Sequence, residues 1–323
     1  MKSKIIVLLG GTGFVGTHIA NRLTRLGYRV RALTRSRERG RTLWMMPNVD
    51  LIEADIHDPA VLATQLRGCE AVINLVGILN ERGDDGSDFQ HVHAELPRKL
   101  IEACKKTGNK RLLHMSALNA DPRTGASHYL KSKGEGETII REAGKAGLHF
   151  NIFRPSVIFG PEDSFFNRFA RLLRLCPYFF PLTCPFARFA PVYVGDVAQA
   201  FVTALAMPAA ASGASYELCG PRRYLLLDLV QYTAELIGVR RRIIPLPDET
   251  SRRLAGWMER VPGKPFSLDN YRSLQVDSVC HGDNGLQQLH IEPTSLESVV
   301  PRYLGKDGAR ADYTDFRSGA RRR

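Results

Sequence analysis

The sequence lacks any run of about 20 apolar residues, the length that a membrane-spanning helix needs. Its first apolar run, Ile5–Leu9, ends at glycines and is shorter than the roughly 7–15 residues of a secretory signal. These absences predict a cytoplasmic protein. A peripheral position at the inner face of a membrane is the alternative.

Cysteine is scarce and has no recognisable spacing. The chain has six cysteines and no Cys-x-x-Cys pair. This scattered arrangement predicts reduced thiols, as in cytosolic proteins, rather than a disulfide framework or a zinc site. His91 and His93 are two apart, so in a helix they would point to different sides. We therefore expect no metal site.

Acidic residues are few relative to basic ones. The formal net charge is +12 at pH 7, which favours contact with phosphorylated cofactors, anionic lipid or nucleic acid. The chain contains no nucleic-acid motif such as a zinc finger, so a nucleic-acid partner is not expected. A hydrophobic content of 44% is sufficient for a packed core.

Residues 164–195 contain no Asp or Glu but hold four arginines and nine aromatic residues. In a helix, the apolar side chains here would share one face, with Arg168 and Arg171 off it; they are Phe165, Phe166, Phe169, Leu172 and Leu173. Three interpretations stay open: a lid helix packed on the core, a helix lying on an anionic membrane, and a wall of a pocket for an isoprenoid or quinone tail.

Apolar segments alternate with amphipathic ones in the first half of the chain. We expect strands at 5–9, 28–34, 49–53, 71–76, 111–116 and 149–154, and helices at 15–26, 59–66, 88–107 and 129–146. Continuous apolar strands between amphipathic helices predict an α/β fold, a Rossmann-like doubly wound parallel sheet with a smaller C-terminal substrate lobe.

The pattern changes after Arg154, where proline becomes frequent and the segments shorten. We expect a Rossmann domain over 1–160 and a mixed substrate lobe over 161–305. Within that lobe, 189–225 is expected to return to the Rossmann sheet through a strand at 191–194 and a helix at 196–206. Residues 306–323 are expected to form a basic, flexible tail.

A glycine-rich turn follows the first expected strand. Gly10, Gly13 and Gly16 have the spacing Gly-x-x-Gly-x-x-Gly and open a helix. Glycines allow a tight turn and let backbone N–H groups approach a pyrophosphate at the helix N-terminus. Thr17 follows Gly16 without the lysine that a P-loop needs. The expected cofactor-binding residues of this turn are Gly10, Thr12, Gly13, Phe14, Val15 and Gly16.

The end of the second strand bears on the choice between NAD and NADP. An acidic residue there would bind the ribose 2′-hydroxyl of NAD. This chain has Arg35 and Arg37 instead, and arginine suits a 2′-phosphate. We therefore expect NADP(H) rather than NAD(H), with Arg35 as the contact.

Later strand ends supply further expected cofactor contacts. Asp55 and Ile56 follow the third strand, where the adenine would lie. Leu75, Val76 and Gly77 lie at the end of the fourth strand, and Gly77 would let the chain pass close to a ribose.

Tyr129 and Lys133 are four apart in an expected helix, so they share one face. A tyrosine phenol is a weak acid, and a neighbouring ammonium would lower its pKa. Ser116 ends the fifth strand and precedes Tyr129 by 13 residues. We expect Tyr129 to move a proton and Ser116 to orient a substrate carbonyl. We expect Lys133 to lower the pKa of the Tyr129 phenol and to bind the nicotinamide ribose.

Together these features resemble the short-chain dehydrogenase/reductase superfamily over about residues 4–240. Arg154-Pro155-Ser156, Gly160-Pro161 and residues 192–198 resemble its extended and atypical branches, which have an epimerase/dehydratase-like nucleotide domain. From this resemblance, Pro155 and Val157 join the expected cofactor contacts.

Segments 10–16, 74–79 and 132–137 are most similar to one group within those branches: the nucleotide-binding accessory subunit of mitochondrial complex I (alpha subcomplex subunit nine) and its bacterial relatives. That similarity implies tightly held NADPH and association with quinone-linked respiratory machinery.

Two positions depart from the superfamily pattern. His93 stands where many members carry an Asn that supports a proton relay, which puts the relay in doubt. Ser116-Ala117 replaces the Ser-Ser pair of sugar-nucleotide epimerases, which argues against a nucleotide-sugar substrate. Two functions remain: an oxidoreductase acting on a hydrophobic carbonyl or quinone-related substrate, and a non-catalytic, NADPH-stabilised accessory or assembly protein of a respiratory complex.

Overall fold

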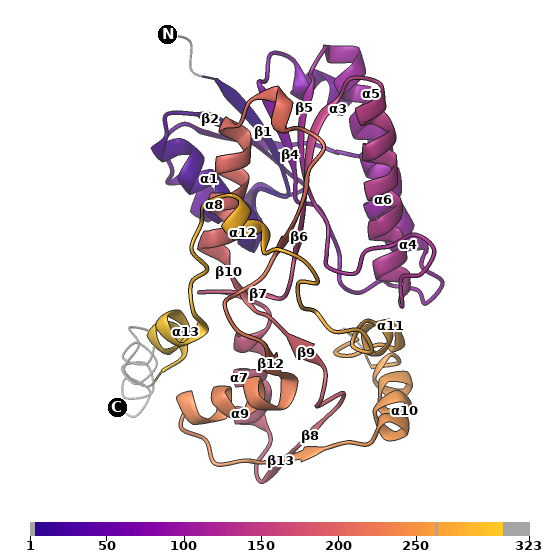
Figure 1. The fold of residues 1–323 in the computed structure, drawn as a ribbon, viewed down its shortest axis with the longest axis vertical. Helices are drawn as coiled ribbons and strands as arrows, with labels where there is room; N and C mark the ends of the chain where they lie inside the picture. Colours follow the sequence, from indigo (N-terminus) through magenta and orange to yellow (C-terminus); the bar gives the residue numbers. More distant parts are fainter. Residues whose placement is uncertain (1–3, 262–263, 306–323) are drawn as a thin grey trace. The chain divides into compact units, whose positions relative to one another are not determined.

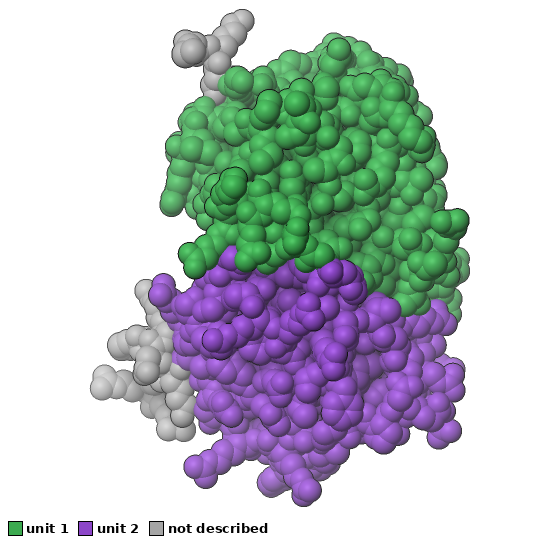
Figure 2. All heavy atoms as spheres, viewed as in Figure 1, with its two compact units in different colours: residues 1–155, 195–218, 282–292 green, residues 156–194, 219–281, 293–323 purple. Residues whose placement is uncertain are grey.

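The computed structural model describes residues 4–261 and 264–305. The chain forms two compact units, coloured separately in Figure 2. Of the described residues, those within 1–155, 195–218 and 282–292 form unit 1, and those within 156–194, 219–281 and 293–323 form unit 2. The tail expected at 306–323 lies outside the described residues.

Unit 1 contains a seven-stranded parallel sheet, which confirms the predicted α/β fold class. The strand order is β11-β6-β5-β4-β1-β2-β3. The strands are β1 (Ile5–Leu9), β2 (Arg29–Thr34), β3 (Val49–Glu53), β4 (Ala71–Asn74), β5 (Arg111–Met115), β6 (His149–Pro155) and β11 (Ser215–Leu218). The order reverses between β1 and β4, the place where doubly wound sheets bind ligands beyond the carboxyl ends of their strands.

Helices cover both faces of this sheet. They are α1 (Phe14–Arg25), α2 (Arg41–Trp44), α3 (Pro59–Leu66), α4 (Ser87–Gln90), α5 (Leu96–Thr107), α6 (His128–Lys145), α8 (Val194–Ala206) and α12 (Gly285–Gln288), with short 3-10 turns at Arg37–Gly40 and Ala209–Ala211. Figure 1 shows α5 and α6 on one side of the sheet and α1 and α8 on the other. Residues 6–9 of β1 and 71–73 of β4 are fully buried, which explains why these segments are continuously apolar.

Unit 2 packs helices around short strand pairs. Its elements are β7 (Ile158–Phe159), α7 (Phe166–Leu175), β8 (Phe179–Leu182), β9 (Arg188–Phe189), β10 (Val192–Tyr193), β12 (Tyr224–Leu225), α9 (Leu226–Leu236), β13 (Arg242–Pro245), α10 (Asp248–Met258), α11 (Leu268–Ser273) and α13 (Leu296–Leu304). Phe166 and Leu173 of α7 are fully buried in a core shared with α9 and α13. For the apolar face of α7, this favours the interpretation of a helix packed on the core.

The structure differs from two expectations about the elements. Within the segment 189–225, only Ser215–Leu218 joins the seven-stranded sheet, as β11 beside β6. The strand expected at 191–194 is the two-residue β10, which pairs with β7 in a separate sheet. The helix expected over 88–107 changes to a π turn at His91–Glu95 before α5 begins.

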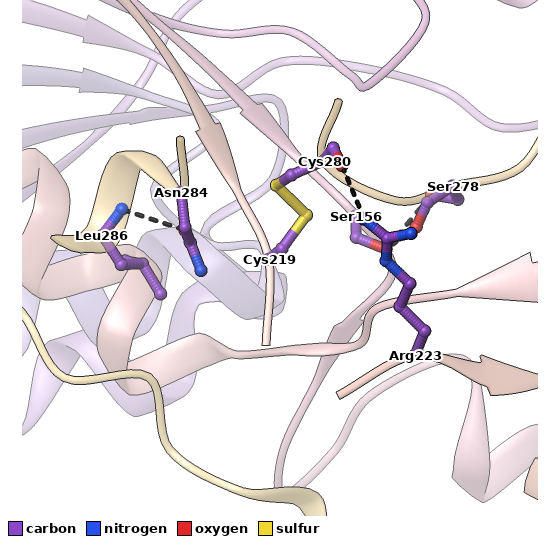
Figure 3. Close-up of a disulfide and its surroundings, with 7 residues drawn as sticks. All are labelled: Ser156, Cys219, Arg223, Ser278, Cys280, Asn284 and Leu286. Atoms are coloured by element: carbon purple, nitrogen blue, oxygen red, sulfur yellow. Dashed lines mark hydrogen bonds between the residues drawn. A yellow bond between two sulfur atoms is a disulfide. The ribbon is translucent and has the colours of Figure 1, made fainter. Parts of the chain in front are cut away.

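The expectation that all cysteines are reduced is wrong for one pair. Cys219 and Cys280 form a disulfide within unit 2, 61 residues apart (Figure 3). Cys69, Cys104, Cys176 and Cys184 are free thiols. Sequence spacing cannot reveal such a long-range pair, because the two residues meet only through folding. The Arg223 guanidinium donates a hydrogen bond to the Cys280 carbonyl beside the bond.

Loss of this disulfide is expected to destabilise the protein by roughly 2–4 kcal/mol, because the bond closes a long loop and restricts the unfolded chain. The Cys219→Ser/Cys280→Ser double variant should therefore unfold at a lower urea midpoint. A Cys104→Ser variant, which removes a free buried thiol, controls for side-chain replacement. Equal midpoints for the wild type and the double variant would contradict the prediction.

Candidate active site

The glycine-rich turn joins β1 to α1 and leaves no room for a side chain at Gly16. Gly10 has φ +77°, a conformation that favours glycine, and a Cβ at Gly16 would lie 2.4 Å from the Gly10 carbonyl oxygen. Helix α1 begins after Gly13 with no side-chain cap. Its first backbone N–H groups therefore remain available for an anion. This cradle fits the pyrophosphate of a dinucleotide. Thr12, Phe14 and Val15 lie in the turn or the first turn of α1.

The two expected arginines follow β2, and their side chains differ in their contacts. Arg37 donates from its guanidinium to the Leu51 carbonyl oxygen at 3.3 Å, on neighbouring β3. Arg35 is exposed and makes no side-chain hydrogen bond or ion pair with the residues that the structure describes. Of the two, Arg35 is the one whose guanidinium can meet a ligand.

The residues after β3 are only partly accessible. The Asp55 carboxylate is exposed and accepts a hydrogen bond from the His57 N–H at 2.9 Å. The Ile56 side chain is 8% exposed and packs in the core of unit 1. Of the two, Asp55 is the one whose side chain can meet a ligand.

The chain after β4 runs directly past Lys133. Leu75 donates its N–H to the Leu9 carbonyl, and Val76 donates its N–H to the Asn74 side chain. A Cβ at Gly77 would lie 3.1 Å from the Lys133 ammonium nitrogen. Gly77 thus allows the close approach of this lysine, a role that goes beyond a plain turn.

Lys133 connects α6 to the end of β5. Its side chain is buried, and its ammonium donates to the Met115 carbonyl oxygen at 3.1 Å. Ser116 is the next residue, 3% exposed, and its hydroxyl has no hydrogen-bond partner within the described residues. A buried polar group without a partner is costly, so a ligand carbonyl is a fitting partner for this hydroxyl. The structure therefore brings Ser116 and Lys133 together.

Burial determines the pKa values of the two α6 residues. It raises the pKa of the Tyr129 phenol to about 12. It lowers the pKa of Lys133 to about 8, against a smaller opposing effect of the Glu137 carboxylate. The sequence-based expectation that Lys133 lowers the phenol pKa is therefore wrong for the chain alone, because desolvation of the phenolate dominates. At neutral pH Tyr129 holds its proton.

His93 lies in the π turn and links three segments. Its Nε2 accepts a hydrogen bond from the Ile78 N–H at 3.1 Å, and its Nδ1 lies 2.9 Å from the Ser132 hydroxyl. The Ser132 hydroxyl in turn donates to the Tyr129 carbonyl oxygen at 2.9 Å. Burial, and then the charge of Lys133, hold the pKa of His93 far below its usual range.

The neutral His93 ring has only one arrangement that satisfies these bonds. Because Nε2 accepts, Nδ1 carries the proton and donates it to Ser132. Both ends of the hydrogen-bonded chain finish on backbone groups. His93 therefore holds the Gly77–Ile78 loop against α6, and its ring has no proton left for a relay to Lys133.

Three residues of the segment Ser132–Glu137 make close contacts that hold α6 in place. Cβ atoms at Gly134 and Gly136 would lie 2.4 Å from the Asp121 carbonyl carbon and 2.2 Å from the His93 carbonyl oxygen. Both glycines are thus needed for close packing of α6. The Glu137 carboxylate accepts two hydrogen bonds from the Arg154 guanidinium, at 2.6 and 2.7 Å.

His114 is a further buried group near the site. It lies on β5, its Nδ1 is 3.2 Å from the Asn74 side-chain nitrogen, and its Nε2 has no partner within the described residues. Burial and the Lys133 charge lower the pKa of His114 to about 3, so the ring is neutral. The sequence pattern does not single out His114, because β5 is typical of a core strand, and it marks Asn74 only as the first residue of the segment 74–79.

The remaining expected contacts fall in different units. Pro155 ends β6 in unit 1, and Val157 follows in unit 2, where its carbonyl accepts from the Val192 N–H. Across residues 4–261 and 264–305, no group of three or more His, Cys, Asp or Glu side chains is placed to hold a metal ion. His91 instead pairs with Glu95 at 2.9 Å.

Comparison with known proteins identifies a family and several relatives. A family model described as the NAD dependent epimerase/dehydratase family matches residues 6–219. The chain is 31% identical over 310 residues to NADH dehydrogenase (ubiquinone) 1 alpha subcomplex subunit 9, mitochondrial, of Rattus norvegicus, covering 91% of this chain and 78% of that protein.

A second relative is an enzyme by its name. The chain is 29% identical over 246 residues to ceramide reductase of Caulobacter vibrioides, covering 76% of this chain and 74% of that protein. Among solved structures, dTDP-glucose 4,6-dehydratase (DesIV) of Streptomyces venezuelae, with NAD and TYD bound, matches with a TM-score of 0.72 and 19% identity. The match covers 93% of this chain and 95% of that one. That likeness concerns the fold.

Proposed function

We propose, from the premise that the chain belongs to the NAD dependent epimerase/dehydratase family, that it is an NADP(H)-dependent reductase of a hydrophobic carbonyl or quinone-related substrate. The observation that carries the proposal is the buried, unpartnered Ser116 hydroxyl, which directly follows the carbonyl group that holds Lys133. A nicotinamide cofactor, when bound, would supply hydride. The chain's own residues would bind the cofactor, orient the substrate carbonyl and protonate its oxygen.

The reducing direction follows from the state of Tyr129. A phenol with a pKa of about 12 is protonated at neutral pH. It is therefore suited to donate a proton to a carbonyl oxygen as that oxygen gains charge, and poorly suited to remove a proton from an alcohol. The Ser116 hydroxyl would donate a second hydrogen bond to the same oxygen.

Lys133 has a positioning role in this proposal. Its ammonium is fixed by the Met115 carbonyl and lies beside Gly77, where it can donate to a ribose hydroxyl of the cofactor. The residues that would hold the dinucleotide are those of the 10–16 turn, Arg35, Asp55, Gly77 and Lys133. The hydrophobic character of the substrate rests on the name of the Caulobacter relative.

We further propose that Arg35 selects NADP(H). The Arg35→Gln variant should bind NADPH about 10- to 100-fold more weakly, because a charged hydrogen bond to the 2′-phosphate contributes roughly 1.5–3 kcal/mol. Its affinity for NADH should change by less than about twofold. Arg37→Gln is the matched control and should have the smaller effect, since the Arg37 guanidinium already donates to Leu51.

Calorimetric titration of both nucleotides into the three proteins measures this difference. An equal loss of NADPH and NADH affinity in Arg35→Gln would contradict the assignment. Mass spectrometry of nucleotide released from the purified wild type gives an independent answer, with NADP(H) expected.

A second function is favoured by the respiratory relatives. The 31% identity to a complex I subunit supports a non-catalytic, NADPH-stabilised accessory or assembly role. Bound NADPH without consumption, and co-purification with respiratory-complex subunits, would favour it. NADPH oxidation by hydrophobic ketones or quinones would favour the reductase. A peripheral, membrane-proximal location of this chain is compatible with both.

A further inference from the structure

Part of unit 2 exposes large apolar side chains next to unpaired arginines. Strand β8 alternates between exposed and buried side chains: Phe179 is 57% exposed, whereas Phe180 and Leu182 are 8% and 3% exposed. The buried members pack in the core of unit 2. Phe179 is thus on the outer face of the strand and does not pack in the core.

Strand β13 extends this outer face. It pairs with β8 in parallel, with Arg242 opposite Phe179 and Ile244 opposite Pro181. Directly opposite residues in a sheet lie on the same face. Figure 1 shows the two strands side by side, near α7 and α9. The outer face therefore mixes an arginine with an aromatic and an aliphatic side chain.

The end of α7 belongs to the same surface. The Arg241 guanidinium donates to the Leu173 carbonyl oxygen of α7 at 3.1 Å, which ties α7 to the start of β13. Leu175 at the helix end is 72% exposed, and Tyr178, just before β8, is 80% exposed. We name the whole set the β8–β13 surface: Arg174, Leu175, Tyr178, Phe179, Arg240, Arg242 and Ile244.

The charge on this surface has one sign. Residues 164–195 and 236–247 contain no Asp or Glu. Within the part of the chain that the structure describes, no carboxylate forms an ion pair with Arg174, Arg240 or Arg242, all of which are exposed. Three exposed guanidinium groups without counter-charges favour an anionic partner.

We propose that the β8–β13 surface binds anionic membrane lipid, with its arginines on lipid phosphates and its aromatic side chains in the interfacial region. Arginine beside Tyr and Phe is the composition of peripheral membrane-binding surfaces. Pairing with a strand of another protein fits less well, because Pro181 and Pro245 remove N–H donors from the two strands. Across the described residues, no helix is both long and apolar enough to span a bilayer. The binding inferred here is therefore peripheral.

Sedimentation with vesicles tests the proposal on the full chain. We expect binding to phosphatidylcholine vesicles that contain phosphatidylglycerol, none to pure phosphatidylcholine, and release by high salt. The Arg240→Gln/Arg242→Gln variant should lose about thirtyfold in partition coefficient, since each basic side chain at an anionic surface contributes roughly fivefold. Tyr178→Ser/Phe179→Ser should lose about tenfold or more, because apolar area leaves the interface.

Matched variants in unit 1 provide the controls. Arg25→Gln/Arg67→Gln removes two exposed arginines, and Leu26→Ser removes a side chain that is 60% exposed. Both should retain wild-type binding within about twofold. Equal losses in test and control variants, equal binding to neutral and anionic vesicles, or binding to duplex DNA without binding to vesicles would each overturn the proposal. An unfolding midpoint in urea equal to that of the wild type shows for each variant that the chain remains folded, and the vesicle measurement does not depend on the reductase proposal.

Discussion

Replacement of Tyr129 by phenylalanine is expected to lower kcat for carbonyl reduction by about a thousandfold, within the range that general acids contribute. The substitution removes the hydroxyl but keeps the ring, which packs edge-on against Phe89 and His93 at centroid distances of 5.9 and 5.5 Å. The fold and the affinity for NADPH should therefore remain close to the wild type.

Steady-state NADPH oxidation, measured at saturating nucleotide, gives the comparison. Tyr28→Phe removes a hydroxyl from a tyrosine outside the site and should keep full activity. A Tyr129→Phe enzyme with wild-type kcat would show that another group supplies the proton. His93 is not that group, since its one ring proton is committed to Ser132.

Replacement of Glu137 by glutamine is expected to destabilise the protein by roughly 3–5 kcal/mol, the cost of removing one member of a buried ion pair. The Glu137 side chain is 3% exposed and the Arg154 side chain 26%. Glutamine fills the same volume but leaves the Arg154 guanidinium without its counter-charge. The pair also fixes α6, which carries Tyr129 and Lys133, to β6.

Urea unfolding of the variant and the wild type measures this loss. Glu142→Gln is the control: its exposed pair with Lys145 lies on the same helix and should contribute less than about 1 kcal/mol. If the two substitutions lower the free energy of unfolding equally, the buried pair does not hold α6 in place. Residual activity per folded molecule separates a loss of stability from a loss of chemistry.

The fold and the cofactor turn could be predicted because both depend on local patterns. Alternating apolar and amphipathic segments indicate a parallel sheet, and the spacing of Gly10, Gly13 and Gly16 reflects backbone contacts within one turn. A shared site for Ser116, Tyr129 and Lys133 stays a prediction, and the structure places the Lys133 ammonium at the Met115 carbonyl, next to Ser116. The strand end and the helix face on which they lie follow from the order of the elements.

The features that could not be predicted depend on contacts between residues distant in the sequence. The Cys219–Cys280 bond links positions 61 residues apart, and nothing in their spacing indicates it. The lowered phenol pKa expected from Tyr129 and Lys133 ignored burial, which acts in the opposite direction. The sequence indicates only that His93 replaces a relay residue, whereas its contacts with Ile78 and Ser132 show that it holds the Gly77–Ile78 loop against α6.

The proposed active site and the proposed membrane-binding surface belong to different units. The nucleotide turn and the Ser116, Tyr129 and Lys133 side chains belong to unit 1, and the β8–β13 surface belongs to unit 2. A reductase of hydrophobic carbonyl compounds and an accessory protein of a membrane-bound complex would both benefit from membrane contact. Membrane binding therefore does not distinguish the two functions. Oxidation of NADPH by a substrate does.

The most direct test is the transfer of deuterium from NADPH that carries two deuterium atoms at C4 to a hydrophobic ketone or quinone in a single turnover, followed by mass spectrometry of the product. The reductase proposal predicts a product that carries one deuterium when a ketone is reduced, and NADP⁺ in equal amount with either substrate. Tyr129→Phe should form both far more slowly. NADPH that stays bound and unoxidised by every substrate in the series would contradict the proposal and favour the accessory role.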